Sequence, residues 1–457
     1  METKPTQVVI IGAGLTGLTT AFYLTRRGIS VQIVESADRV GGQIHTFQED
    51  GFTYESGPNT GVVSYPEVAE LFAALEPNCH LETAKEESKR RLIWKGDRFR
   101  ELPSGLLSAI TTPLFTLKDK FRILGEPFRA KGTNPDESVA GLAGRRLGKS
   151  FVDYAVDPFL SGVYAGDPHT LVTRYALPKL YNLEQDYGSF IRGSIAKAKI
   201  PKTERDLLAS KKVFSAKGGL NQLADALAKS IGTKHIILGA KDVTVNPNSN
   251  KWDIRYKTHH GEHTLHADQV VTTIGAYNLP ALLPFIDQKE MEAISNLVYA
   301  PVIQASVGIK NTGTLKFNAF GGLVPSKEKK RILGILFPSA CFESRSPEEG
   351  ALFSFFMGGM KHLDLLTKSD EEIRDIITEE LHLMLGFPKG TEPDMIKIFR
   401  HNHAIPQYEL NSGKRFETVE KLEAQYPGLL IAGNLKGGIG MADRIRQATQ
   451  IGLNIVK

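Results

Sequence analysis

Residues 8–35, with the sequence VVIIGAGLTGLTTAFYLTRRGISVQIVE, decide the fold of this 457-residue chain. The first four residues are an apolar run, which is typical of a strand buried on both faces. A G-x-G-x-x-G pattern follows and opens a helical pattern that continues to about Arg27. Residues 31–34 predict a second strand, which ends at Glu35. Strand, glycine turn, helix, strand and acid, in this order, form the dinucleotide-binding fingerprint of an α/β fold.

Each part of the fingerprint has a physical reason. Gly12 permits a tight turn, Gly14 lets the backbone approach a pyrophosphate, and Gly17 lets helix and strand pack closely. The start of the helix offers unpaired N–H groups and the positive end of its dipole to phosphate. We therefore expect the turn to bind phosphate and the acid with its neighbour to bind ribose. The expected cofactor contacts are Gly12, Ala13, Gly14, Leu15, Thr16, Gly17, Glu35 and Ser36.

The residues after the second strand favour FAD over the other dinucleotides. An acid at position 35 argues against a 2′-phosphate, and hence against NADP, but leaves NAD and FAD open. The double glycine Gly41-Gly42 resembles the continuation found in flavin oxidases of the amine oxidase type, which usually have Arg or Lys where this chain has Gln43. Residues 57–60 resemble the next flavin-contacting turn of that family. The resemblance implies FAD contacts from Gly42, Gln43, Gly57, Pro58, Asn59 and Thr60.

The far end of the chain repeats a strand–glycine turn–helix pattern. Residues 429–434 predict a buried strand that runs into a turn, a glycine-rich stretch follows at 437–440, and a helix begins at about Asp443. In the amine-oxidase-like families an element of this shape closes over the flavin. In the same families the backbone at the position of Val243 contacts the adenine. The resemblance therefore adds Val243, Asn434, Ile439, Gly440 and Met441 to the expected FAD contacts.

The middle of the chain adds a helical pattern at 221–230 and strand patterns at 241–245, 251–257 and 270–274. The predicted fold is α/β, with a discontinuous Rossmann-type FAD-binding domain like that of amine oxidases and GDP-dissociation inhibitors. We expect a substrate-binding domain to be inserted into it, together with a helical subdomain that faces a membrane. The expected ranges are 1–60, 205–275 and 396–457 for the FAD-binding domain, 61–85 and 276–395 for the substrate-binding domain, and 86–204 for the helical subdomain.

Composition excludes several classes of protein. The two cysteines, Cys79 and Cys341, lie too far apart in sequence for a disulfide framework or a multi-cysteine metal site, and we expect Cys341 to be buried and unreactive. A net charge of +5 is too small to imply nucleic acid. No apolar run reaches the ~18 residues of a membrane span, and the polar start lacks a signal-peptide pattern. We therefore expect a cytoplasmic protein, either soluble or peripheral on the cytoplasmic face of the membrane.

Residues 85–131 form a basic segment with interleaved apolar residues. They hold twelve Lys and Arg against six Asp and Glu, so this segment alone carries a charge of +6. Such a mixture suits an amphipathic surface for anionic lipid or a carboxylated ligand. A charged face in contact with water alone explains it equally well.

Several longer stretches resemble one family, the protoporphyrinogen oxidases, which include the related flavin-type coproporphyrinogen III oxidases. Residues 157–168, DPFLSGVYAGDP, carry the most specific resemblance, and residues 184–193, 336–347, 356–359 and 404–408 support it. The resemblance implies six-electron oxidation of protoporphyrinogen IX to protoporphyrin IX by three hydride transfers to FAD. The implied acceptor is O₂, and H₂O₂ is formed. Oxidation of coproporphyrinogen III to coproporphyrin III is the alternative.

The flavin supplies the chemistry of such a reaction, so we expect no catalytic nucleophile, base or metal ion from the protein. A flat apolar substrate edged with carboxylates needs an apolar slot with a cation at its rim. The resemblance implies that Arg91 pairs with a propionate, that Leu323 and Phe342 sandwich a pyrrole, and that Gly162 lines the slot. Simple surface or core packing is the competing interpretation for all four.

Other interpretations remain at this stage. Another flavin enzyme of this fold, such as an amine oxidase or a desaturase, is less favoured because residues 157–168 and 336–347 resemble the porphyrinogen enzymes. A flavin-free binding protein is disfavoured by the intact glycine turns at both chain ends. Four histidines between 259 and 266 lie in a polar, hairpin-like stretch without metal-ligand spacing. The roles of His401 and His403 and the oligomeric state, with a homodimer as one option, stay open.

Overall fold

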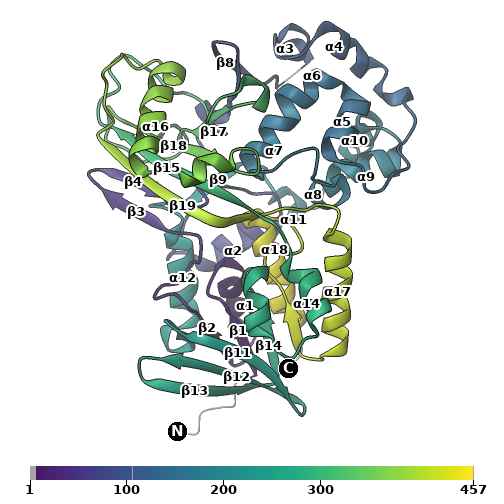
Figure 1. Ribbon diagram of the computed structural model, residues 1–457, viewed down its shortest axis with the longest axis vertical. Coiled ribbons are helices and arrows are strands. Elements are labelled where there is room, and N and C mark those ends of the chain that lie inside the picture. Colours follow the sequence, from purple (N-terminus) through teal and green to yellow (C-terminus); the bar gives the residue numbers. More distant parts are fainter. Residues whose placement is uncertain (1–6, 105, 456–457) are drawn as a thin grey trace.

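The computed structural model describes residues 7–104 and 106–455. Figure 1 shows two sheets one above the other, with a group of helices beside the upper sheet. The lower sheet is parallel, and its strand order is β10-β2-β1-β14-β20. Its strands are β1 (Val8–Ile11), β2 (Val31–Val34), β10 (Ile236–Ile237), β14 (Gln269–Thr272) and β20 (Leu429–Ile431). Strands from the start, middle and end of the chain therefore form one sheet, as the fingerprint and its C-terminal counterpart predicted.

Both faces of the lower sheet are covered. Val8 and Ile10 pack with four helices on one face, whereas Val9 and Ile11 pack against a second layer on the other. The helices of the first face are α1 (Leu15–Arg26), α2 (Pro66–Leu75), α12 (Asn221–Ile231) and α18 (Met441–Asn454). The second layer consists of β11 (Lys241–Asn248), β12 (Lys251–Thr258), β13 (Gly261–Ala267), α13 (Leu279–Leu282), α14 (Gln288–Ser295) and α17 (Ser412–Gln425). The apolar runs of the sequence are continuous because both sides of each strand are buried.

The upper sheet has the strand order β19-β15-β18-β17-β16-β7-β8 and is antiparallel except for the β16–β7 pair. Its strands are β7 (Arg91–Lys95), β8 (Arg98–Glu101), β15 (Tyr299–Ile309), β16 (Gly321–Leu323), β17 (Gly334–Leu336), β18 (Ala351–Gly358) and β19 (Met395–Pro406). Helix α16 (Asp370–Leu385) packs its apolar side on one face of this sheet. The short helix α15 (Pro338–Cys341) follows β17.

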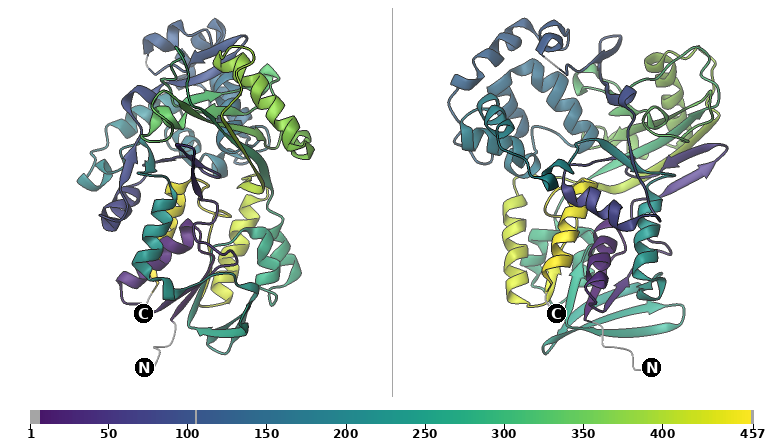
Figure 2. Two further views of the ribbon diagram at one scale, coloured as in Figure 1. Left: turned by 90° about the vertical axis from the view of Figure 1, so that its left-hand side faces the viewer. Right: turned by 180° about the vertical axis from the view of Figure 1, so that it is seen from behind.

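Small sheets connect the two large ones. They are the hairpin β3 (Thr46–Glu49)–β4 (Phe52–Glu55) and the sheet β5 (Gly61–Val62)–β9 (Val213–Ala216)–β6 (Leu81–Thr83). The helical region consists of α3 (Leu106–Thr111), α4 (Leu117–Leu124), the 3₁₀ turn η2 (Glu126–Phe128), α5 (Val139–Leu147), α6 (Lys149–Phe151), the π-turn η3 (Val152–Val156), α7 (Asp157–Val163), α8 (Thr173–Ala176), α9 (Pro178–Tyr187), α10 (Phe190–Ala198) and α11 (Glu204–Leu207). Figure 2 shows these helices beside the upper sheet and clear of the lower one.

The sequence predictions differ from the structure in a few places. Strand β14 ends two residues earlier than predicted, because the chain turns at the carboxyl edge of the sheet. The histidine-rich stretch is not only a connection, since His263 and His266 belong to β13, whose residues alternate in exposure. Strands β7 and β8 lie within the segment expected to be mainly helical, but they pair into the upper sheet. The reason is that the side chains of β7 alternate: Leu92 and Trp94 pack with α16, whereas Ile93 faces the helical region.

Candidate functional site

The first glycine turn lies at the carboxyl end of β1, with its glycines packed as the fingerprint requires. A Cβ atom on Gly17 would overlap the carbonyl oxygen of Gly12, whereas a Cβ on Gly14 would meet no protein atom within 4 Å. Gly14 is the N-cap of α1, and no side chain caps the helix there. The second double glycine lies directly alongside, because Gly41 N donates to Ala13 O at 2.9 Å. Unpaired helix N–H groups, open space and two adjacent glycine turns fit a pyrophosphate.

Glu35 joins the first glycine turn to the residues that follow β2. One of its carboxylate oxygens accepts from Ala13 N at 2.6 Å, and the other accepts from Ala37 N at 2.8 Å and from the Ser36 hydroxyl at 3.2 Å. A carboxylate has about four acceptor sites, so these bonds leave room for a ribose hydroxyl. Ribose binding by Glu35 and Ser36 stays a prediction. The structure shows that Glu35 also stabilises the backbone at Ala13 and Ala37.

The predicted adenine contact lies where the β11 ladder is interrupted. The β11–β12 register shifts between Lys241 and Thr244, so Val243 has no ladder partner. The segment also contacts the end of β2, since Ala240 N donates to Glu35 O at 2.9 Å. Adenine recognition by the backbone at Val243 stays a prediction, and the interruption of the ladder lies at that position.

Residues 57–60 lie against the second double glycine, because a Cβ atom on Gly57 would overlap Gln43 O. Asn59 holds this turn in shape by donating to Gly57 O at 3.1 Å and accepting from the Ser354 hydroxyl at 2.7 Å. The Gln43 amide donates to His403 O at 3.3 Å, so this departure from the family pattern ties the turn to β19.

Glu55, just before this turn, is a buried connection between the regions. Its carboxylate accepts from Leu220 N at 2.9 Å and from the Thr46 hydroxyl at 2.7 Å, and the buried Arg345 lies 3.5 Å away. Burial raises the pKa of Glu55, against the lowering by these partners. Its backbone carbonyl accepts from Gln304 on β15 at 2.7 Å. The turn at residues 57–60 is thereby fixed to the start of α12 and to the upper sheet together.

The C-terminal glycine turn faces the same edge. The Tyr408 hydroxyl donates to Asn434 O at 2.9 Å and accepts from Gly438 N at 3.1 Å, and the Tyr299 hydroxyl donates to the Asn434 side chain at 3.2 Å. Met441 begins α18, and its Cε lies 3.0 Å from where a Cβ on Gly61 would stand. Ile439 packs with Tyr164 and Tyr408. The start of α18 therefore lies against β5, which directly follows residues 57–60, with α7 nearby.

The four predicted substrate contacts are only partly brought together. Gly162 on α7 and Leu323 on β16 touch, because a Cβ on Gly162 would overlap Leu323 Cδ2. Arg91 is exposed at the start of β7, paired in register with Gly321, and its guanidinium lies 5.8 Å from the centre of the Phe320 ring. Phe342 is buried after α15 with its ring 5.4 Å from the Arg345 guanidinium. Their roles toward a substrate stay predictions.

Tyr277 and Tyr299 at this edge were not predicted from the sequence, whereas His401 and His403 were noted there without a role. The Tyr277 and His403 rings stack with centroids 4.1 Å apart, and Tyr299 meets Tyr277 edge to face at 5.2 Å. His401 lies at 2.6 Å from Ser56 O through Nε2. These residues come from η5 (Ala276–Asn278), β15 and β19, and no local motif marks them, so only the paired strands reveal their proximity.

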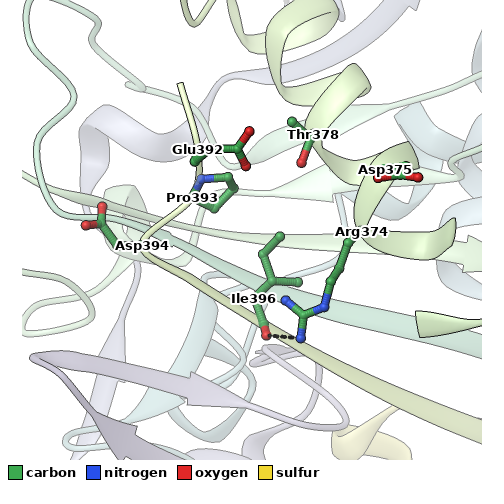
Figure 3. Close-up of a pocket in the computed structure, with 7 residues that line it drawn as sticks. All are labelled: Arg374, Asp375, Thr378, Glu392, Pro393, Asp394 and Ile396. Carbon is green, nitrogen blue, oxygen red and sulfur yellow. Dashed lines mark hydrogen bonds between the residues drawn. The ribbon is translucent and has the colours of Figure 1, made fainter. Parts of the chain in front are cut away.

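Two other features lie apart from the glycine turns. A surface hollow of about 380 Å³ lies between α16 and the start of β19, where Arg374 donates to Ile396 O and Asp375, Glu392 and Asp394 are among the lining residues (Figure 3). Among residues 7–104 and 106–455, no three His, Cys, Asp or Glu side chains are grouped to hold a metal ion. Cys341 is buried, as predicted, and burial raises the pKa of its thiol to about 11.

Known proteins of similar sequence and structure agree with this architecture. Residues 15–442 match the family described as flavin containing amine oxidoreductase. Protoporphyrinogen oxidase 2, chloroplastic/mitochondrial, of Arabidopsis thaliana is 30% identical over 96% of this chain and 91% of its own length. Coproporphyrinogen III oxidase of Bacillus subtilis (strain 168) is 26% identical over 96% of each chain. The crystal structure of reduced UDP-galactopyranose mutase superposes with a TM-score of 0.73 at 17% identity, covering 98% of this chain and 95% of its own.

Proposed function

The chain belongs to the flavin containing amine oxidoreductases, an enzyme family that uses FAD, and on this premise we propose that it oxidises a porphyrinogen to a porphyrin. The observation that carries the proposal is similarity to protoporphyrinogen oxidases over nearly the whole length of both chains, including a bovine one at 27% identity. The resemblance is not confined to the cofactor turns that all flavin oxidases share. It includes α7 and the segment after β17, which lie outside the lower sheet.

In this proposal FAD held at these turns would supply the hydride acceptor, and the chain's own residues would orient a saturated meso carbon of the macrocycle toward it. The residues proposed to hold FAD are those of the turns at 12–17, 41–43, 57–60 and 434–441, with Glu35, Ser36 and Val243 at the adenosine end. Gly162 and Leu323 form an apolar contact between α7 and β16 against which a pyrrole can pack. Three such oxidations remove six electrons and six protons, and O₂ takes up the electrons as three H₂O₂.

The substrate-binding role belongs to 61–85 and 276–395, and the FAD-binding role to 1–60, 205–275 and 396–457.

The substrate is proposed to be protoporphyrinogen IX, with coproporphyrinogen III as the second candidate because the Bacillus subtilis relative carries that name. The two differ by two propionates in place of two vinyl groups. The test is anaerobic mixing of the holoenzyme with each porphyrinogen separately, with flavin absorbance as the readout. Bleaching by protoporphyrinogen IX alone or by both supports the first candidate, and bleaching by coproporphyrinogen III alone supports the second. No bleaching by either contradicts the proposal.

Arg91→Ala is expected to raise the KM for porphyrinogen about tenfold and to leave FAD bound. A charge-assisted hydrogen bond contributes about 1.5–3 kcal/mol, and exposure of this side chain places the effect at the low end. Within the described residues Arg91 forms no ion pair, so its charge is available to a propionate. The matched control is Arg90→Ala, since exposed Arg90 already pairs with Glu101 at 2.9 Å. Equal KM values for wild type and Arg91→Ala would remove Arg91 from the site.

We also propose that α4 and η2 contact an anionic membrane surface on the cytoplasmic face. Leu117, Phe121 and Leu124 are each about 70% exposed and share one face of α4, whereas Asp119 is buried on the other. Phe128 follows at 84% exposure, and the surrounding segment is basic. This arrangement suits an interfacial helix. No helix in the described part of the chain has the length and apolarity of a membrane span.

Phe121→Ser with Phe128→Ser is expected to lower the affinity for phosphatidylserine-containing vesicles at least tenfold in a sedimentation assay. Burying one such aromatic side chain contributes about 1.5–3 kcal/mol. Porphyrinogen oxidation in detergent-free solution should be unchanged. The control is Tyr277→Ser, which removes a half-exposed aromatic from another surface and should bind vesicles like the wild type. Vesicle binding that survives the double substitution would contradict this surface.

A further inference from the structure

Two buried arginines lie behind the C-terminal glycine turn. Arg415 on α17 is 0% exposed and Arg444 on α18 is 7% exposed. Arg415 donates through Nε to Leu435 O at 3.0 Å, and Arg444 donates through Nη2 to Lys436 O and Gly438 O, both at 2.9 Å. Both guanidinium groups therefore bind carbonyl oxygens of residues 434–440, the turn that leads into the N-terminus of α18.

Neither arginine has a counter-charge. Within residues 7–104 and 106–455, neither guanidinium forms an ion pair with Asp or Glu. Their other hydrogen-bond partners are neutral, namely the Ser412 hydroxyl and the Asn411 amide oxygen for Arg415 and the Gln447 amide oxygen for Arg444. Burial lowers the pKa of both groups, yet arginine stays protonated in proteins. Buried charges are normally paired, so two unpaired ones beside a single turn need an explanation.

The remaining charges at the turn only partly offset this excess. The half-buried Asp443 accepts from Gly440 N at 3.0 Å and is the acid closest in sequence to Arg444. The positive end of the α18 dipole adds to the two cations. Tyr408, whose pKa is raised by burial, is neutral and serves to hold Gly438 and Asn434. The turn thus carries net positive charge in a region of low dielectric, where charges act strongly.

We propose that Arg415 and Arg444 are positioning residues that act through the 434–440 turn to favour the reduced flavin. An oxidised flavin that takes up a hydride, which is two electrons and one proton, gains one unit of negative charge. A positive turn facing the ring system lowers the free energy of that product more than that of the neutral reactant. The inference rests on FAD, and it does not depend on the porphyrinogen assigned under the proposed function.

The test is the equilibrium constant for two-electron reduction of bound FAD, measured anaerobically against a redox dye by flavin absorbance. Arg444→Gln and Arg415→Gln are each expected to lower this constant about tenfold, which corresponds to about 30 mV for a two-electron couple. Asp443→Asn, which removes the carboxylate that accepts from Gly440 N at the end of the turn, should shift the constant in the opposite direction. Arg446→Gln is the matched control, because it removes an exposed cation of the same helix that lies over Tyr65.

A purely structural role gives different results. In that case the glutamine variants would bind FAD less tightly while the reduction equilibrium of the bound fraction stayed at the wild-type value, and this outcome overturns the proposal. If an arginine variant does not fold, Asp443→Asn decides, since an unchanged or lowered constant for that variant also overturns it. The readout uses no porphyrinogen, so a failure to oxidise protoporphyrinogen IX leaves the test intact.

Discussion

Gly14→Ala is expected to leave the protein folded while weakening FAD binding about 10- to 100-fold. The backbone of Gly14 has φ −73° and ψ 179°, which any residue can adopt, and an added Cβ would meet no protein atom within 4 Å. The methyl group would instead enter the space in front of the α1 N-terminus, where the pyrophosphate is predicted to bind. Overpacking of a fitted site costs about 1–3 kcal/mol, and ~1.4 kcal/mol is tenfold in affinity.

The measurement is titration of apo-protein with FAD, together with the melting temperature of the apo form. Gly17→Ala is the contrasting variant, because its Cβ would overlap Gly12 O and should lower the melting temperature of the apo form itself. Gly144→Ala in α5 is the neutral control, since its Cβ would make only an ordinary contact with Val152 at 3.6 Å. A Gly14→Ala protein that binds FAD like the wild type would show that the turn does not hold the pyrophosphate.

Arg146→Met is expected to open the helical region, at a cost of about 3–5 kcal/mol, because it breaks a buried ion-pair network. Arg146 and Glu126 are both 0% exposed and Glu184 is 1% exposed. Arg146 Nη1 lies 2.9 Å from Glu126, and its Nε donates to Glu184 at 2.6 Å. Glu126 also accepts from Phe190 N and Ile191 N and so ties η2 to the start of α10. Among the described residues, removal of the cation leaves the buried Glu126 without an ion-pair partner, whereas Glu184 keeps Arg145.

Limited proteolysis and hydrogen exchange of the α9–α10 amides are the measurements. The exposed Arg98 pairs with Asp97, so Arg98→Ala removes an ion pair on the surface and should change neither readout. Arg146→Met amides that exchange at the wild-type rate would contradict the expectation.

The same network predicts acid sensitivity of the helical region. Burial raises the pKa of Glu126, but the Ser189 hydroxyl, the backbone amides of α10 and Arg146 lower it further, so it lies below its ordinary value. Glu184 behaves likewise, with Arg145 and Arg146 as its cations. A carboxyl with a lowered folded-state pKa contributes stability that is present above its unfolded pKa of about 4.3 and is lost as the pH falls through the folded value. Protease protection of the region should therefore fall below about pH 4 in the wild type, and less so in Arg146→Met.

The sequence by itself determined the nucleotide-binding framework, because its signals are local. A fully buried strand, a glycine turn and an acid at the end of the next strand are specified within 28 residues, and β1, α1 and β2 follow this prediction within one residue. The C-terminal glycine turn was predicted for the same reason. The pairing of β1 with β14 and of β14 with β20 brought these turns to one edge, as parallel topology requires.

The tertiary structure alone decided which side chains stand behind those turns. Arg415 and Arg444 have no motif, and Tyr408 lies 26 residues from the carbonyl oxygen it binds. Glu55 reaches Arg345 across 290 residues. Such contacts depend on how two sheets and their helices pack, and side-chain type and spacing do not encode that packing. The glycine turns were predictable because the backbone geometry of a turn is set by neighbouring residues in the sequence. The charges around them were not predictable, because the electrostatic potential at a site depends on distances in space.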